Sequence, residues 1–265
     1  MTSTETHTDL SPIATYPDLN GKVAVITGGS RGIGAATAVA LGANGVSVAV
    51  VGRDQAALEK TVEAVAARGA RAIGVVADST REDQLAALRS TVNEQLGAVD
   101  ILAVFAGGNG MPVSTADETS EHWREVVETN LTSTFLTISA FLSDMLARHS
   151  GVIITMASAA ERQAAKSSAA YAASKAGVIA FSRHLAGEYA REGIRINCVA
   201  PSAIENERMR SWVPEDQLRA LGEAFPLGRL GQPDDVASAT LFLASSASSW
   251  ITGTTLDVAG GKVML

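Results

Sequence analysis

The stretch Thr27-Gly-Gly-Ser-Arg-Gly-Ile-Gly34 decides the fold class of this 265-residue chain. It follows a β-branched apolar run and leads into an alanine-rich segment with a helical pattern. Its glycines allow the backbone to turn sharply and to approach a diphosphate without obstruction by Cβ atoms. A strand, a glycine loop and a helix in this order predict a dinucleotide site. The predicted contacts in the loop are Gly28, Ser30, Arg31, Gly32, Ile33 and Gly34.

Seven short apolar runs alternate with helical patterns along the chain. The runs are nearly continuous, which is typical of parallel strands buried on both faces. Strands that alternate with helices form right-handed βαβ units, so we expect an α/β, doubly wound Rossmann fold with helices on both faces of a seven-stranded parallel sheet. The predicted strands are 22–27, 46–51, 70–77, 99–106, 151–157, 194–200 and 255–259.

Local signals place several helix starts and one long connection. Asp54 is a predicted N-cap, residues 80–83 resemble a capping box, and Pro233 suits a first helical turn. No internal boundary or repeat is visible, so we expect a flexible extension over 1–20 and one catalytic domain over 21–265. Residues 202–225 are too long for an ordinary connection and predict an irregular substrate lid.

Composition excludes several classes of protein. Hydrophobic residues make up 46% of the chain and charged residues 18%, and the net charge of −7 disfavours nucleic-acid binding. The single cysteine, Cys198, excludes an internal disulfide and a cysteine-rich zinc site; it lies in an apolar run and is predicted to be a buried thiol. No metal site, signal peptide or apolar stretch of about 20 residues is apparent, so we expect a cytoplasmic protein without a membrane span.

The end of the second strand bears on the choice between NADP(H) and NAD(H). An NAD site of this architecture normally has a carboxylate there, which hydrogen-bonds the ribose 2′-hydroxyl. This chain instead has Gly52 followed by Arg53. Arg53 and Arg31 together suit a 2′-phosphate, because guanidinium groups bind phosphate through paired hydrogen bonds. We therefore expect NADP(H), with two solvated arginines as the alternative interpretation.

Tyr171-Ala-Ala-Ser-Lys175 places a phenol and an ammonium one helical turn apart on the same face. We expect Lys175 to lower the pKa of Tyr171, so that the phenol exchanges a proton with a substrate oxygen. Ser158 ends the fifth predicted strand and could hydrogen-bond the same oxygen. Taken alone the spacing is a common chance pattern, and its weight comes from following a dinucleotide loop.

The ordered set of motifs resembles the short-chain dehydrogenase/reductase family, in its single-domain branch, and within it broadly the 3-oxoacyl-carrier-protein reductases. The likeness covers residues 22–261, nearly the whole chain. The matching motifs are TGGSRGIG at 27–34, Asp78 after the third strand, AG at 106–107, Asn130 in VVETNLTS, Ser158, YAASK at 171–175, NCVAP at 197–201, ITG at 251–253 and the glycine pair at 260–261.

The resemblance implies a role for each matched position. Tyr171 would be the acid/base, Ser158 would polarise the carbonyl, Lys175 would bind the nicotinamide ribose, and Asn130 would hold a water linking Lys175 to a proton relay. The remaining cofactor contacts implied are Asp78 at the adenine, Ala106 and Gly107 after the fourth strand, and Pro201 to Ile204 at the nicotinamide.

Three positions depart from the family pattern. Val104-Phe105 replaces two asparagines whose side chains normally stiffen the fourth strand's end, so Phe105 must be packed instead. Ser202 replaces a glycine. Asn206 replaces a threonine, and its amide could still bind a carboxamide with donor and acceptor.

These features predict an NADP(H)-dependent oxidoreductase that reduces a ketone or 3-oxoacyl carbonyl of a small molecule to a secondary alcohol. The alternatives are an NAD-dependent alcohol dehydrogenase of the same fold, enoyl reduction on the same scaffold, and a non-catalytic NADP(H)-binding regulatory protein. The family likeness implies a homotetramer. Two long predicted helices, 120–148 and 169–191, carry apolar residues on several faces and suggest an interface through Trp123, Leu131, Phe135, Phe141 and Phe181.

Overall fold

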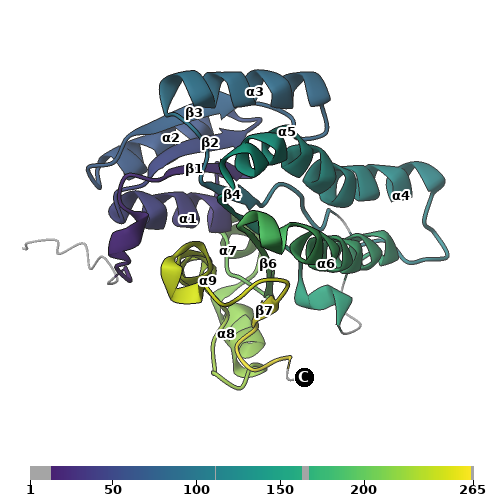
Figure 1. The fold of residues 1–265 in the computed structure, drawn as a ribbon. Coiled ribbons are helices and arrows are strands. Elements are labelled where there is room, and N and C mark those ends of the chain that lie inside the picture. Colours follow the sequence, from purple (N-terminus) through teal and green to yellow (C-terminus); the bar gives the residue numbers. More distant parts are fainter. Residues whose placement is uncertain (1–12, 111, 163–166, 264–265) are drawn as a thin grey trace, which may run out of the picture.

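The computed structural model describes residues 13–110, 112–162 and 167–263. All seven predicted strands are present in one parallel sheet with the order β3-β2-β1-β4-β5-β6-β7, and helices flank both of its faces (Figure 1). The Rossmann-type prediction is therefore confirmed. The strands are β1 Val23–Thr27, β2 Ser47–Gly52, β3 Ala72–Val76, β4 Ile101–Val104, β5 Gly151–Met156, β6 Ile194–Pro201 and β7 Thr255–Val258.

The helices between the strands follow the predicted pattern. A π-helical segment, η2, joins α4 to α5, so the predicted helix over 120–148 is continuous but wound differently at its centre. The main helices are α1 Gly32–Ala43, α2 Gln55–Ala66, α3 Glu82–Gln95, α4 Ser120–Val127, α5 Ser133–Arg148, α6 Ala169–Tyr189, α7 Glu207–Trp212, α8 Glu215–Glu223 and α9 Pro233–Ala244, and η2 is Glu128–Thr132.

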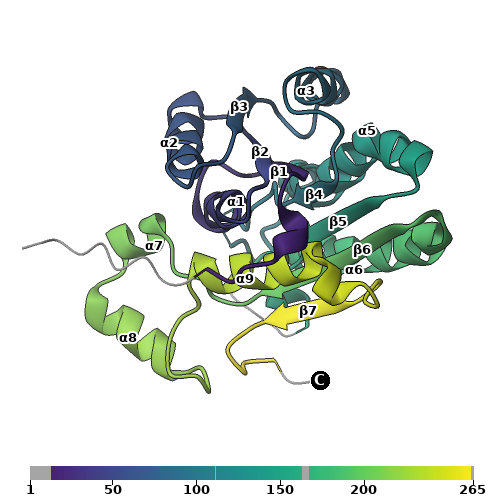
Figure 2. The same ribbon diagram turned by 60° about the vertical axis from the view of Figure 1, so that its left-hand side comes forward.

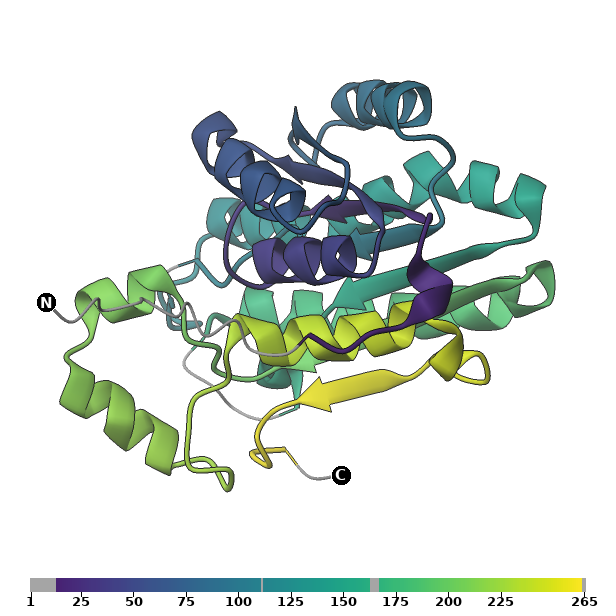
Figure 3. The same ribbon diagram turned by 90° about the vertical axis from the view of Figure 1, so that its left-hand side faces the viewer.

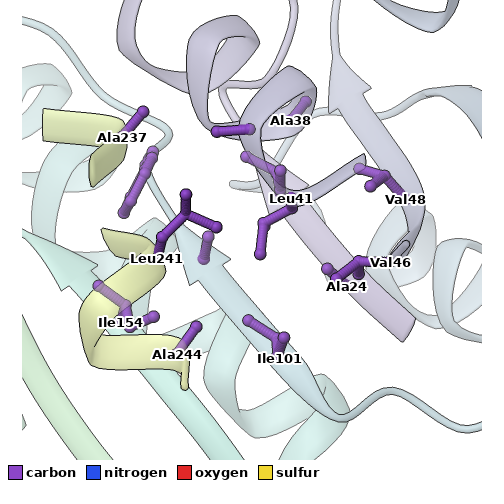
Figure 4. Close-up of a cluster of buried hydrophobic side chains, with 14 of the residues drawn as sticks. Ala24, Ala38, Leu41, Val46, Val48, Ile101, Ile154, Ala237, Leu241 and Ala244 are labelled. Carbon is purple, nitrogen blue, oxygen red and sulfur yellow. The ribbon is translucent and has the colours of Figure 1, made fainter. Parts of the chain in front are cut away.

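Each face of the sheet has its own apolar core. On one face α1 and α9 pack together, with Leu41 and Leu241 buried over Ile101 and Ile154 (Figure 4). On the other face α3, α5 and α6 cover alternate residues of the same strands, with Phe141 at the centre. Burial on both faces explains why the central strands are nearly continuous apolar runs.

The two edge strands are less buried than the sequence predicts. All residues of β7 are partly exposed, and Val76 of β3 is 51% exposed. Each edge strand has a neighbour on one side only, which leaves part of its surface to solvent.

Two of the three predicted helix starts are confirmed. The Asp54 carboxylate accepts the Ala57 N–H and caps α2, and Pro233 opens α9 behind a capping box formed by Gln232 and Asp235. The capping box predicted over 80–83 is wrong. Arg81 occupies the N-cap position of α3 without a side-chain cap, because the Thr80 hydroxyl donates to Asp78 instead.

Residues 13–20 of the predicted extension lie against the domain. The Tyr16 N–H donates to the side chain of Asn44, Asp18 accepts the Ser246 N–H, and Leu19 is fully buried. The described part of the segment predicted to be flexible, residues 13–20, is therefore held on the domain by backbone-to-side-chain hydrogen bonds and by the buried Leu19. The prediction for residues 1–12 lies outside the described residues.

The predicted lid over 202–225 is helical, which corrects its description as irregular. It contains α7 and α8, which lie beyond the carboxyl ends of the strands and stand out from the rest of the domain (Figures 2 and 3). Asn206 caps α7, and two acidic residues in the first turn of α8 favour that helix through its dipole, although α8 has no side-chain cap.

The aromatic residues expected at an interface separate into two groups. Trp123 and Phe135 are 40% and 49% exposed, and the Phe135 ring stacks edge-on against Phe181 at 6.1 Å between centroids. Phe141 instead belongs to the core, because it points from α5 onto the sheet. Leu131 packs against Gly177 of α6.

Candidate active site

The glycine loop lies where the strand order of the sheet reverses, between β1 and β4. Close approaches of the backbone shape the loop at this point. Gly28 has φ +66°, and a Cβ atom there would lie 2.7 Å from the Phe105 carbonyl oxygen. A Cβ atom at Gly34 would lie 2.2 Å from the Gly28 carbonyl oxygen. Only glycine fits these two positions, and together they bring the start of α1 against the ends of β1 and β4.

The N-terminus of α1 is open to an anion. Its N-cap residue, Arg31, has extended backbone angles and makes no side-chain cap, so no side chain of the described residues caps the first N–H groups of the helix. Gly32 has φ +52°, and a Cβ atom there would meet nothing within 4 Å. A free helix start with open space beside it fits a diphosphate.

The predicted 2′-phosphate corner holds two arginines and two aspartates. Arg31 donates to Asp54 at 2.5 Å, and this hydrogen bond is the main cause that lowers the pKa of Asp54. Hydrogen bonds from Thr80 lower the pKa of Asp78, and the nearby charge of Arg53 adds to the effect. Each arginine is therefore close to a carboxylate that the sequence analysis did not assign to it, and their convergence on a 2′-phosphate stays a prediction.

The end of β4 is fixed by a hydroxyl that the sequence analysis missed. The Thr27 side chain is fully buried and accepts the N–H groups of Phe105 at 3.1 Å and Ala106 at 3.2 Å. Phe105 itself is packed into the core, as expected. A threonine that ends a buried strand beside a glycine loop was the available signal, since a buried hydroxyl needs a partner.

Asn130 lies in the π-helical segment and is fully buried. Its amide exchanges hydrogen bonds with Gly108, accepting the N–H at 3.0 Å and donating to the carbonyl oxygen at 3.1 Å. A Cβ atom at Gly107, which has φ +136°, would lie 2.6 Å from Asn130 Oδ1 and 3.5 Å from Lys175 Nζ. Gly107, Asn130 and Lys175 thus meet at one place, although the sequence analysis linked only Asn130 to Lys175.

Ser158 and Tyr171 are brought together from β5 and α6. Ser158 follows β5 and its hydroxyl accepts the Ala160 N–H at 3.2 Å, while Ser168 caps α6 by accepting the Tyr171 N–H. The Ser158 hydroxyl also lies close enough to the Tyr171 phenol to lower its pKa. Lys175, one turn later, places its Nζ 5.6 Å from the centre of the tyrosine ring.

The expected effect of Lys175 on Tyr171 is wrong for the free protein. Burial raises the pKa of Tyr171, and the nearby Ser158 hydroxyl opposes this rise only in part. Lys175 is buried and donates to the Met156 carbonyl oxygen at 2.9 Å, so the strand end holds its ammonium. Burial in turn lowers the pKa of Lys175 to about 8. The phenol is therefore a proton donor at neutral pH.

Near the predicted nicotinamide contacts, β6 ends at Pro201 and the chain turns into the lid. Ile204 pairs with Gly231, where a Cβ atom would lie 2.4 Å from the Ile204 side chain. The side-chain oxygen of Asn206 accepts the Met209 N–H at 2.9 Å. This oxygen therefore caps α7, and the expected contact of Asn206 with a carboxamide stays a prediction.

Other kinds of site find little support in the described part of the chain. Cys198 is fully buried, and burial raises the pKa of its thiol to about 11, which agrees with the predicted inert core thiol. Within residues 13–110, 112–162 and 167–263 no group of three or more acidic, histidine or cysteine side chains could hold a metal ion. Across the same residues, every helix is too short or too polar to cross a bilayer.

Comparisons with known proteins agree with this geometry. A family model described as enoyl-(acyl carrier protein) reductase matches residues 28–262. The 3beta-hydroxysteroid dehydrogenase 1 of Eggerthella lenta is 39% identical over 254 residues, covering 94% of this chain and 96% of the relative. The 3-oxoacyl-(acyl carrier protein) reductase of Vibrio cholerae is 36% identical over 253 residues, covering 94% and 100%.

A solved structure agrees as well. The 3-oxoacyl-(acyl carrier protein) reductase of Brucella melitensis with bound NAD superimposes with a TM-score of 0.86 at 32% identity, covering 98% of this chain and 99% of the other. Similarity of this extent, together with the fold and the ordered motifs, is decisive: the chain belongs to the short-chain dehydrogenase/reductase family of oxidoreductases.

Proposed function

We propose that this oxidoreductase uses NADP(H) to reduce a ketone or 3-oxoacyl carbonyl to a secondary alcohol. The observation that carries the proposal is the meeting of three side chains: the buried Lys175 Nζ lies 5.6 Å from the centre of the Tyr171 ring, and Ser158 lies close enough to the phenol to lower its pKa. Two donors that converge on one oxygen suit a carbonyl on which negative charge develops. Relatives named as a hydroxysteroid dehydrogenase and a 3-oxoacyl reductase support carbonyl and alcohol chemistry.

The residues at the carboxyl edge of the sheet fit a nicotinamide dinucleotide. We assign the diphosphate to the open start of α1, the adenine to Asp78, the 2′-phosphate to Arg53 with Arg31, and the nicotinamide to the turn after β6. The cofactor supplies a hydride when bound. The residues proposed to hold it are Gly28, Ser30, Arg31, Gly32, Ile33, Gly34, Arg53, Asp78, Ala106, Gly107, Lys175, Pro201 and Ile204.

The chain's own groups move the proton. Tyr171 donates its phenolic proton to the substrate oxygen as the carbonyl carbon is reduced, and Ser158 donates a hydrogen bond to the same oxygen. The buried ammonium of Lys175 stabilises the resulting phenolate and passes a proton back to it. We propose that Asn130, which lies beside Gly107 with Lys175, orders the water that re-protonates the lysine.

Two other redox reactions are alternatives to NADP(H)-dependent carbonyl reduction, and one observation favours each of them. NAD(H)-dependent alcohol oxidation is favoured by the Arg31–Asp54 pair, because this pair reduces the positive charge facing a 2′-phosphate. Enoyl reduction is favoured by the description of the matching family model. A non-catalytic NADP(H)-binding protein is disfavoured, since binding alone has no need of the phenol, hydroxyl and ammonium that meet here.

A substrate screen tests the proposal. NADPH and NADH oxidation would be followed by absorbance with ketones, 3-oxoacyl thioesters and enoyl thioesters. We expect turnover of a ketone or a 3-oxoacyl thioester, faster with NADPH, and loss of that preference in Arg53→Ala. Absence of turnover with every carbonyl would contradict the reductase, and an unchanged cofactor preference in Arg53→Ala would contradict the assignment of the 2′-phosphate.

We propose a cytoplasmic homotetramer that binds a small-molecule substrate. The exposed Trp123 and Phe135 support an interface through α4 and α5, and Phe135 also lines a groove of about 690 Å³ between α3 and α5. Light scattering tests the assembly, and a monomer at micromolar concentration would contradict it.

A further inference from the structure

Three charged side chains meet beside the turn that follows Ser158. Arg162 Nε lies 2.6 Å from Glu161 Oε1 and 3.2 Å from Asp257 Oδ1. The side chains of Glu161, Arg162 and Asp257 are only 13%, 18% and 23% exposed. Charges buried to this extent are costly even when they are paired, and the proposed proton transfer uses none of them, which indicates a separate role for the cluster.

The pair of Arg162 with Asp257 joins two parts of the sheet that are not neighbours. Arg162 follows β5, Asp257 belongs to β7, and β6 lies between these strands. Asp257 is in register with Ala200 of β6, which packs with residues of α6, so both side chains point to the α6 face of the sheet. The pair with Glu161 is local, because the two residues are adjacent in the sequence. Of the two pairs, the one with Asp257 therefore ties the turn to the sheet.

The turn held in this way sets the direction of the Ser158 hydroxyl. Ser158 is the N-cap of the short helix η3 (Ala159–Glu161), and its Oγ accepts the Ala160 N–H at 3.2 Å. The Arg162 N–H donates to the Ala159 carbonyl oxygen and closes the same turn. An Oγ atom that accepts from the turn keeps its own hydrogen for a substrate oxygen, so a shift of the turn would misdirect that donor.

We infer that Arg162 is a positioning residue: its ion pair with Asp257 clamps the turn after β5 and thereby directs the Ser158 hydroxyl at the substrate oxygen. The inference rests on the proposed function in assigning that oxygen to Ser158. Arg162 acts through Ser158 and itself makes no contact with the substrate. Loss of the clamp should lower kcat more than it changes KM, because the hydrogen bond from Ser158 strengthens as negative charge develops on the substrate oxygen.

Glu161 competes with Asp257 for the same nitrogen atom. Arg162 Nε carries one hydrogen and both carboxylates approach it, so that none of these three atoms has a hydrogen-bond partner of good geometry among the described residues. Burial raises the pKa of Glu161, and the charge of Arg162 opposes this rise while that of Asp257 adds to it. Removing the charge of Glu161 should therefore leave the Nε–H group to Asp257 and keep the clamp, whereas removing the charge of Asp257 should release it.

The kinetics of carbonyl reduction test this inference. In Arg162→Met and in Asp257→Asn we expect kcat to fall about 10-fold, with KM and NADPH affinity within about twofold of the wild-type values. Glu161→Gln is the matched control from the same cluster and should keep kcat within about twofold. Arg162→Lys keeps the charge and should retain at least about a third of the wild-type kcat. In a Ser158→Ala background, Arg162→Met should lower kcat by less than about twofold, because its effect depends on Ser158.

Hydrogen exchange of the turn gives a second readout, which needs no turnover. The amide groups of residues 160–162 should exchange about 10-fold faster in Arg162→Met and in Asp257→Asn than in wild type, and at the wild-type rate in Glu161→Gln. Asp257→Asn supplies both readouts should Arg162→Met fail to fold.

The result that overturns each part of the inference is different. Unchanged exchange in Arg162→Met and Asp257→Asn would overturn the clamp, and faster exchange with an unchanged kcat would overturn the positioning role. A 10-fold loss of kcat in Glu161→Gln, or a full further loss in the Ser158→Ala background, would overturn the claim that the pair with Asp257 acts through Ser158. A wild-type protein that reduces no carbonyl would instead overturn the proposed function and the role of Ser158 with it, and the exchange rates would still show whether Arg162 holds the turn.

Discussion

The Nζ atom of Lys175 donates a hydrogen bond to the carbonyl oxygen of Met156 at 2.9 Å, which ties the first turns of α6 to the end of β5. This contact orients a buried ammonium between the strand that precedes Ser158 and the helix that carries Tyr171. Burial lowers the pKa of Lys175 to about 8, so the folded protein carries a costly charge at neutral pH.

We therefore expect Lys175→Met to stabilise the protein at neutral pH while abolishing turnover. The lowered pKa means that the unfolded chain binds more protons between about pH 8 and 10.5, so the penalty is fully present below pH 8 and disappears as pH rises to 10.5. At neutral pH the buried charge lowers the free energy of unfolding by about 3 kcal/mol. Lys175→Met recovers this amount but loses the hydrogen bond to Met156, which offsets about 1 kcal/mol of the recovery.

Denaturant unfolding at pH 7 and near pH 10 measures this effect. Lys175→Met should unfold with a free energy about 2 kcal/mol above that of wild type at pH 7 and should lose this advantage near pH 10. Lys60→Met, at an exposed position on α2, is the control for the substitution itself. A variant less stable than wild type at pH 7 would contradict this prediction, because it would mean that the surroundings of Lys175 fully offset the cost of burying its charge.

The proximity of Ser158 to Tyr171 should be visible in the pH dependence. Because Ser158 lowers the pKa of the phenol, Ser158→Ala should raise the pKa of Tyr171 further. Alcohol oxidation needs the phenolate as a base, so its kcat/KM should rise with pH and level off at a higher pH in Ser158→Ala than in wild type. Ser158→Thr, which keeps a hydroxyl, should restore the wild-type profile. Coincident profiles for wild type and Ser158→Ala would be inconsistent with this contact.

Thr27 should matter more for stability than its size suggests. Its fully buried hydroxyl accepts two N–H groups at the end of β4, so Thr27→Val leaves both without a partner in a site of the same shape. We expect a loss of about 2–4 kcal/mol in the free energy of unfolding. Thr27→Ser retains the hydroxyl and should lose about half of that or less, mainly through the missing methyl group. Equal losses in the two variants would argue against the hydrogen bonds.

The glycines of the loop should differ in their tolerance of a methyl group. Gly34→Ala places a Cβ atom 2.2 Å from the Gly28 carbonyl oxygen. We expect this variant to lose more than about 3 kcal/mol in the free energy of unfolding, and to lose nucleotide binding as well. Gly32→Ala faces open space and bears only the strain of φ +52°, about 1 kcal/mol. Thermal unfolding compares them, and similar melting temperatures would contradict the close approach.

The sequence predicts the fold well because its signals are local and repeated. Each strand is a run of apolar residues, Asp54 and Pro233 mark helix starts by their own chemistry, and the glycine loop joins a strand to a helix in a recognisable order. The link between Asn130 and Lys175 is implied by the family resemblance alone, and the structure brings both residues beside Gly107.

What the sequence does not reveal depends on contacts between distant residues. The pairing of Arg31 with Asp54 joins two loops, and the partners of Thr27 lie about 80 residues away. The pKa of Tyr171 was predicted in the wrong direction because helical spacing shows that Lys175 is near but not that burial outweighs its charge. The helices of the lid were missed because they are short and polar.

The most direct test of the central claim is kcat/KM for carbonyl reduction in Tyr171→Phe, measured alongside NADPH affinity. Tyr171 is partly buried and its phenol is the proposed proton donor, so removing one oxygen atom should lower kcat/KM by about 100-fold or more and leave NADPH affinity within about twofold. Reduction at the wild-type rate by Tyr171→Phe would contradict the account.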